Sequence, residues 1–176
     1  MKRHWLWLED QPDTVADFKA IIERRITVSL VTTPAELIRQ LLAIDASERD
    51  RIGLILDVML INNPLLTCPP SWHGGEKAIY FQTKMGYDAG LVFYENFMLP
   101  TPRIPNQPFT PPPVVFLTVV HQDMRDVEVR CGKLKEQWAQ VRGVETGEAC
   151  VEWARKWDAN GQGLLGILQR WEGEIP

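Results

Sequence analysis

The stretch RIGLILDVML, residues 51 to 60, places one aspartate, Asp57, at the end of an apolar run. Leu54, Ile55 and Leu56 precede it, and an apolar run of this length is typical of a strand buried on both faces of a parallel sheet. An ionised carboxylate that is buried without a partner is strongly destabilising. We therefore expect Asp57 to lie where the strand ends and where water or a metal ion begins.

Length and composition indicate a globular protein. The chain has 176 residues, which suits one domain or possibly two very small ones, and its 45% hydrophobic residues with seven tryptophans are enough for a core. The net charge is -4, and no basic cluster is interleaved with aromatic residues. This charge pattern argues against direct binding of nucleic acid.

The spacing of the cysteines and the hydropathy of the sequence indicate the cellular compartment of the protein. Cys68, Cys131 and Cys150 are odd in number and widely spaced, so the sequence indicates reduced thiols rather than disulfides or a zinc site. The first residues reach acidic side chains before any apolar segment of signal-peptide length, and no later run approaches a membrane span. We expect a soluble cytoplasmic protein.

Strand-like and helix-like segments alternate along the chain. HWLWLED is followed by a segment with Val15, Phe18 and Ile22 at helical spacing, and the β-branched ITVSLVTT is followed by a helix beginning near Pro34. Strands are thus expected at residues 4–10, 26–33, 51–60 and 113–120. This alternation predicts an open α/β fold, with a parallel sheet covered by helices on both faces.

Polar side chains stand at the expected strand ends. Glu9 and Asp10 end the first strand, Asp57 ends the third, and Thr118 lies near the end of the fourth. In open α/β sheets the ligand binds outside the carboxyl ends of the strands. Hard cations such as Mg²⁺ prefer oxygen ligands, so three carboxylates at this edge predict a divalent-metal site. Taken singly, Glu9 and Asp10 also suit the start of a helix, and Thr118 suits any strand.

At these residues the sequence resembles the receiver domain of two-component response regulators. The resemblance rests on LED, ILDVML, GYDAGLVFY and FLTVV, and it covers roughly residues 5–157. It implies a doubly wound, flavodoxin-like fold with a five-stranded parallel sheet in the order 2-1-3-4-5. It also implies a domain spanning residues 1–158, followed by a C-terminal helix and tail at 159–176.

The resemblance assigns roles to the residues at the strand ends. Glu9 and Asp10 match the acidic pair that binds Mg²⁺, and Asp57 matches the phospho-acceptor, which also binds the metal. Met59 matches the residue whose backbone carbonyl binds the metal, and Thr118 matches the hydroxyl residue that contacts the phosphoryl group. The partner implied is a histidine kinase or phosphotransfer protein, and the only catalysis implied is self-phosphorylation from a phosphodonor.

One expected feature of the family is not found where we place it. Receiver domains carry a lysine at the end of the fifth strand, and the fifth strand expected here, AQVRGVE at residues 139–145, offers only Arg142 as a cation. We therefore expect Arg142 to stand in for that lysine beside the catalytic residues Asp57 and Thr118. Arginine is a planar fork and a poor substitute for a compact ammonium. Two alternatives therefore stay open: a scaffold that is never phosphorylated, and, ranked lower, a Mg²⁺-dependent phosphohydrolase or nuclease. The latter commonly needs an acid where Met59 stands.

Two insertions distinguish the chain from a minimal receiver. The first, residues 61–90, lies beside Asp57, and its Trp72, Tyr80 and Phe81 predict that part of it packs down as a lid. The second, residues 100–113, carries a proline at every third position, at 102, 105, 108 and 111. That spacing suits a stiff connector, or else a polyproline segment recognised by a partner protein.

The end of the sequence predicts an amphipathic helix. Leu164, Ile167, Leu168 and Trp171 follow the spacing of one apolar helical face. We expect this helix to pack on the domain, with a homodimer seam or a protein partner as the rival interpretation.

Overall fold

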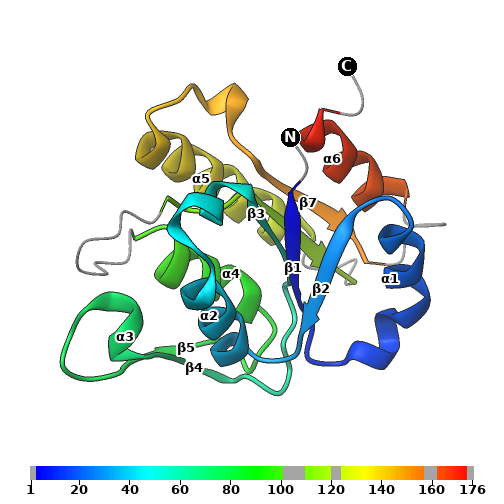
Figure 1. The fold of residues 1–176 in the computed structure, drawn as a ribbon. Helices are drawn as coiled ribbons and strands as arrows, with labels where there is room; N and C mark the ends of the chain where they lie inside the picture. The colour runs from blue at the N-terminus through cyan, green and yellow to red at the C-terminus, as the bar shows by residue number, and fades with distance from the viewer. Residues whose placement is uncertain (1–2, 101–109, 120–123, 157–161, 174–176) are drawn as a thin grey trace.

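A computed structural model describes residues 3–100, 110–119, 124–156 and 162–173 of the chain (Figure 1). The five strands of the main sheet are all parallel and lie in the order β2-β1-β3-β6-β7. Their bounds are β1 His4–Leu8, β2 Thr27–Val31, β3 Ile52–Asp57, β6 Val114–Thr118 and β7 Val151–Arg155. This order is the predicted 2-1-3-4-5 of a flavodoxin-like receiver fold, which is therefore confirmed.

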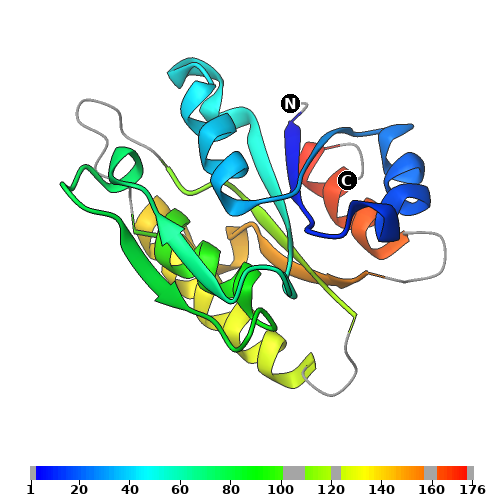
Figure 2. The same ribbon diagram turned by 90° about the horizontal axis from the view of Figure 1, so that it is seen from below.

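Helices cover both faces of this sheet, as Figure 2 shows with the sheet between two helical layers. The helices are α1 Ala16–Glu23, α2 Pro34–Ala43, α3 Pro70–His73, α4 Ala89–Phe93, α5 Met124–Arg142 and α6 Gln162–Glu172. Short 3₁₀ turns lie at Pro12–Val15, Ala46–Arg51 and Thr146–Glu148, and a π-helical turn, Tyr94–Met98, continues α4. Helices α1 and α6 form one layer; α2, α4 and α5 form the other.

Alternate residues of β1 supply the two halves of the core. Trp5 and Trp7 point into a cluster with residues of α1 and α6, whereas Leu6 and Leu8 point into a cluster with residues of α2, α4 and α5. Successive side chains of a strand point to opposite faces, so a strand that is apolar throughout must be buried on both sides. The apolar strands of the sequence therefore predicted the layering correctly.

A glycine in β3 makes room for a large ring on β1. Gly53 pairs with Trp5 in the sheet, and a Cβ atom at Gly53 would lie 2.5 Å from the Trp5 indole. The ring of Trp5 stacks on that of Trp171 in α6, with 5.9 Å between centroids, and the Trp5 Nε1–H donates to Glu172 at 3.2 Å. These contacts hold α6 against the sheet.

The fifth strand is not where the sequence placed it. Residues 139–142 belong to α5, whose buried Val127, Cys131, Leu134 and Trp138 keep helical spacing to the end of the helix. Gly143, with φ of 67°, follows the helix in the left-handed conformation that glycine adopts at little cost. The strand expected at 139–145 was therefore wrong, and β7 begins at Val151.

The C-terminal helix α6 packs on the sheet, as its apolar spacing predicts. Leu164, Leu165, Ile167 and Leu168 are buried in the same cluster as Trp5 and Trp7. The division of the chain at residue 158 stays a prediction. Of the proline series, residues 102, 105 and 108 lie outside the described residues, and Pro111 is buried.

The first insertion, residues 61–90, forms a structured hairpin. Strands β4 Leu65–Cys68 and β5 Ile79–Gln82 pair antiparallel, and the short helix α3 connects them. Leu66, Cys68 and Trp72 are buried in the cluster on the α2, α4 and α5 face. The hairpin is thus an additional layer outside α2 and α4, as Figure 2 shows.

Two of the three aromatic residues that predicted a lid are packed against the domain. Trp72 donates its Nε1–H to the carbonyl of Phe97 at 2.7 Å, and the ring of Phe81 lies 5.2 Å from that of Phe97. Tyr80, by contrast, is 62% exposed. These contacts anchor the hairpin on the π-helical turn rather than over Asp57.

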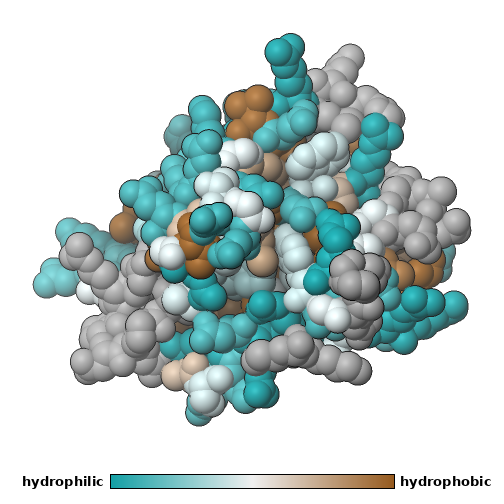
Figure 3. All heavy atoms as spheres, turned by 90° about the horizontal axis from the view of Figure 1, so that it is seen from above, coloured by the Kyte–Doolittle hydropathy of each residue, from teal (hydrophilic) through white to brown (hydrophobic). Residues whose placement is uncertain are grey.

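Hydrophilic side chains predominate on the face seen in Figure 3, where apolar side chains appear as small separate patches. Among the described residues, no helix is both long enough and apolar enough to cross a membrane.

Candidate functional site

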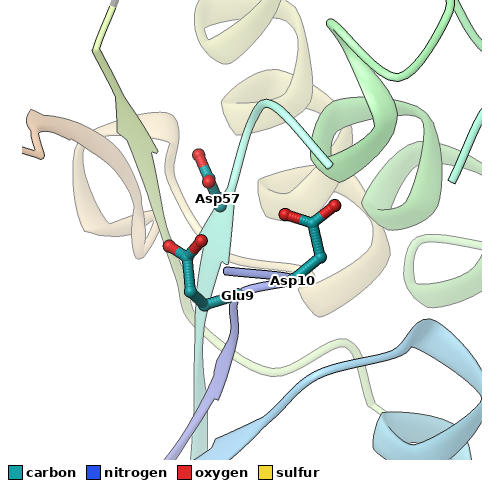
Figure 4. A group of neighbouring side chains, drawn as sticks. All are labelled: Glu9, Asp10 and Asp57. Carbon is teal, nitrogen blue, oxygen red and sulfur yellow. The ribbon is translucent and has the colours of Figure 1, made fainter. Parts of the chain in front are cut away.

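Four strands bring their polar residues to one edge of the sheet. Glu9 and Asp10 follow β1, Asp57 ends β3, Thr118 ends β6, and Lys156 follows β7. Because the strands are parallel, these ends meet at the same edge. Figure 4 shows the carboxylates of Glu9, Asp10 and Asp57 next to one another. The predicted convergence of the acids is therefore observed.

Lys156 lies between two of the acids. Its ammonium is 2.7 Å from Oδ2 of Asp57 and 2.6 Å from Oε2 of Glu9. All three side chains are nearly fully buried, with 6% of the Lys156 side chain exposed and 1% or less of the two carboxylate side chains. Ion pairs with this little water are screened far less than surface pairs. Lys156 is thus the cation that Asp57 needs at the end of its apolar strand.

Burial and charge shift the pKa values of this pair. Burial, together with the negative charge of Glu9, raises the pKa of the Asp57 carboxyl to about 7. The ammonium of Lys156 and the hydrogen bond from the Met59 N–H act in the opposite direction and lower this pKa. Burial alone would lower the pKa of Lys156, but the carboxylates of Asp57 and Glu9 outweigh it and raise this pKa above its usual value. The ammonium is therefore the stable form of Lys156, and a further cation beside Asp57 would favour the ionised form of that carboxyl.

The donor atoms fit a hard divalent cation. One oxygen from each of Glu9, Asp10 and Asp57 can be chosen so that the three lie within 4.8 Å of one another. Asp10 Oδ2 accepts from the N–H of Asn62 at 2.8 Å, while its buried Oδ1 has no hydrogen-bond partner among the described residues. Three carboxylates against one ammonium leave the site with excess negative charge. This is the oxygen-rich, anionic environment that Mg²⁺ prefers.

A small pocket lies beside the carboxyl ends of β3 and β6. It has a volume of about 100 Å³, and its walls include Met59 and Thr118 together with Lys84, Tyr87 and Asp88. Thr118 is 5% exposed, and its carbonyl accepts from the N–H of Lys156 at 2.9 Å. The backbone N–H of Met59 donates to Asp57 Oδ1 at 3.2 Å. Of the residues to which the resemblance assigns a role, Met59 and Thr118 thus line this pocket.

A glycine lets α4 begin directly against the acceptor strand. Gly90 donates its N–H to the carbonyl of Val58 at 3.1 Å. A Cβ atom at Gly90 would lie 2.1 Å from the carbonyl oxygen of Asp57, so a larger residue would have to push the helix away. The glycine of the DAGL motif thus fixes the distance between α4 and Asp57.

Arg142 does not reach this site. It ends α5, where it forms an ion pair of 3.6 Å with Asp50 and lies 5.3 Å from the centre of the Trp138 ring. The pocket that it lines is bordered by Ile52 and Pro113, at the edge where the strands begin. The expectation that Arg142 replaces the lysine was therefore wrong.

The sequence carried little signal for Lys156. In VEWARK, Val151 and Ala154 are buried while Glu152 and Arg155 are not, so this edge strand mixes polar with apolar residues and lacks the apolar run of β3. Lys156 follows immediately. This segment lacks the apolar or β-branched run that predicts the other strands of the sheet.

Comparison with known proteins supports the fold. No protein family model matches the chain, and no curated protein sequence matches it. Among solved structures, the chain is similar to a response regulator receiver domain protein from Clostridium thermocellum, with 14% identity, 98% of this chain and 99% of that chain covered, and a TM-score of 0.50. It is also similar to a response regulator from Colwellia psychrerythraea, with 12% identity, 99% and 100% coverage, and a TM-score of 0.49. The first likeness shows that this chain has the receiver fold.

Proposed function

We propose that this chain is a receiver domain that accepts a phosphoryl group on Asp57 and passes the signal on through contacts with another protein. The observation that carries the proposal is the buried ammonium of Lys156, 2.7 Å from Asp57 and 2.6 Å from Glu9. Structural ion pairs also occur, but this one lies at the carboxyl ends of the strands, beside a third acid and a pocket.

The residues divide the chemistry of phosphoryl transfer among them. A carboxylate oxygen of Asp57 attacks phosphorus, the bond from phosphorus to the donor nitrogen or oxygen breaks, and its electron pair leaves with the donor group. Lys156 then faces the new phosphoryl oxygens, and the hydroxyl of Thr118 donates to one of them. Little covalent work falls to the protein, so positioning and charge supply most of the rate.

The acids Glu9, Asp10 and Asp57, with the backbone carbonyl of Met59, would hold Mg²⁺. The ion would supply positive charge that neutralises the oxygens of both the acceptor and the incoming phosphoryl group. The unpaired oxygen of Asp10 and the surplus of carboxylates support this assignment. We therefore retain Mg²⁺ as the cofactor of the proposed reaction.

The position of Lys156 changes the balance among the alternatives. The case for a scaffold that is never phosphorylated rested on the absence of a lysine at the acceptor, and that premise was wrong. A histidine kinase or a phosphotransfer protein remains the proposed phosphodonor, acting in the cytoplasm.

The test is to incubate the chain with Mg²⁺ and acetyl phosphate and to measure its intact mass. We expect a mass increase of one phosphoryl group in the wild type and none in Asp57→Asn. Omission of Mg²⁺ should abolish the increase as well. A wild type that stays unmodified with both acetyl phosphate and a phosphorylated phosphotransfer protein would favour the scaffold.

A further inference from the structure

We propose that Lys84, from the insertion at residues 61–90, is a second cation for the phosphoryl group on Asp57. In the unphosphorylated protein it pairs with Asp126 at the start of α5, which lines the same pocket as Lys84. This inference rests on the proposed function, and it adds a residue that a receiver without the insertion would not possess.

Lys84 lines the pocket beside Val58 and Met59, the two residues that follow the acceptor Asp57. Lys84 shares the walls of that pocket with Met59, which follows β3, and with Thr118, which ends β6. Val58, Leu91 and Val127 make part of the wall apolar.

The backbone of Lys84 is fixed while its ammonium is free to move. Its N–H donates to Asp88 Oδ1 at 2.8 Å, and Asp88 is held in turn by Arg130 of α5 at 2.9 Å. The neighbouring Gly86 donates its N–H to Thr83 Oγ1 at 2.8 Å. The side chain, however, is 70% exposed, and four methylene groups allow its ammonium to swing about a fixed base.

The ion pair that Lys84 forms with Asp126 is weak. Its Nζ lies 3.4 Å from Oδ2 of Asp126, whose side chain is 55% exposed. Exposed pairs of this kind contribute about 0 to 1 kcal/mol. A phosphoryl group adds a charge of about −1.5 to −2 and three strong acceptor oxygens, so it outcompetes one carboxylate for the same ammonium.

The exchange has a consequence for α5. When Lys84 turns toward the phosphoryl group, Asp126 in the first turn of α5 loses its partner in the insertion. The second link between these elements, from Arg130 to Asp88, is more buried and would stay. Phosphorylation would thus release the beginning of α5 and leave its middle in place.

The experiment measures the affinity of the chain for trifluoroberyllate with Mg²⁺, a mimic of the phosphorylated aspartate, by amide NMR titration. We expect Lys84→Ala to weaken this affinity about 5- to 10-fold, as loss of one charge-assisted contact predicts. Lys77→Ala is the matched control, since Lys77 is an exposed lysine of the same insertion and does not line the pocket. Its affinity should equal that of the wild type.

A second variant separates the ion-pair exchange from general charge effects. Asp126→Asn alone should strengthen the binding of trifluoroberyllate. This gain should be lost when Asp126→Asn is combined with Lys84→Ala. Equal affinities of Lys84→Ala and the wild type, or a gain from Asp126→Asn that is unchanged without Lys84, would overturn the inference alone. A wild type that binds no trifluoroberyllate would overturn the proposed function and this inference with it.

Discussion

At the scale of single residues, the charge of Lys156 determines how two buried carboxylates can coexist. Glu9 is fully buried and Asp57 is 1% exposed, so neither has enough water to stabilise its charge. Removing one partner of a buried ion pair typically costs about 3 to 5 kcal/mol, because the remaining charge loses its partner. The structural and the proposed chemical role of Lys156 therefore depend on the same contacts.

We expect Lys156→Met to lower the free energy of unfolding by about 3 to 5 kcal/mol. The loss should be smaller when Mg²⁺ is present, because the metal would compensate the two carboxylates. Urea denaturation followed by tryptophan fluorescence, with and without Mg²⁺, measures both effects. Arg142→Met is the control: its ion-pair partner Asp50 is 71% exposed, so the substitution should cost about 1 kcal/mol or less and leave the response to Mg²⁺ unchanged.

An equal loss in the two variants would show that Lys156 has no special place in the site. A response to Mg²⁺ that persists unchanged when Asp57 is replaced by alanine would show that the metal binds elsewhere.

The acids of the site could be predicted from the sequence because each follows an apolar run in which a lone charge stands out. Glu9, Asp10 and Asp57 all have this context. Lys156 does not, since a lysine after the mixed residues of an edge strand is indistinguishable from an ordinary surface lysine. Only the pairing of β7 with β6 brings it to Asp57.

At the scale of elements, the hairpin of β4 and β5 belongs partly to the core and partly to the surface. On one side Leu66 and Trp72 are each 1% exposed, and on the other Leu65 and Tyr80 are 49% and 62% exposed. Antiparallel strands commonly bury one face and leave the other to water. The hairpin should therefore be energetically coupled to the domain through its inner face alone.

We expect Trp72→Ala to destabilise the protein by about 3 to 5 kcal/mol, because it leaves a cavity and removes the hydrogen bond to the Phe97 carbonyl. Tyr80→Ala, in the same hairpin, should change stability by no more than about 0.5 kcal/mol. Thermal unfolding monitored by circular dichroism distinguishes them. Should both variants behave like the wild type, the hairpin would be an independent appendage.

The boundaries of helices and strands could be predicted where the sequence followed one hydrophobic periodicity. The prediction failed where a helical pattern and a strand pattern overlapped. The apolar residues of α5 keep helical spacing through Trp138, yet the segment from Ala139 also contains Val141 and Val144, which suit a strand. Helix propagation from a long, packed segment prevailed over this local preference, and Gly143 ended the helix. The hairpin within 61–90 was missed because its strands are only four residues each.

At the scale of the whole molecule, the edge strand β7 links the site to the rest of the sheet, because Lys156 directly follows this strand. Lys156 donates its N–H to Thr118, and the strand before it pairs with β6 throughout, including Phe116 with Trp153. Trp153 packs in turn against the cluster that contains residues of α5. We expect a displacement of the Lys156 ammonium to reach β7 and α5 along these contacts.

We expect trifluoroberyllate and Mg²⁺ to shift amide signals beyond the surroundings of Asp57, across β7 and the packed face of α5. In Lys156→Met, any remaining shifts should be confined to the immediate surroundings of the acids. Amide NMR spectra of the two proteins provide the comparison. Shifts confined to those surroundings in the wild type would indicate that the domain binds the anion without changing shape.

The ion pair between Asp57 and Lys156 also constrains how the protein is made. The two residues are 99 positions apart in the chain. At about 5 to 20 residues per second, a ribosome needs roughly 5 to 20 seconds between them. Throughout that interval a nascent chain already contains all three acids but lacks the lysine that the proposed phosphoryl transfer requires. An unfinished chain would thus not accept a phosphoryl group from a kinase. Phosphorylation of Asp57 would occur only after synthesis and folding had reached β7.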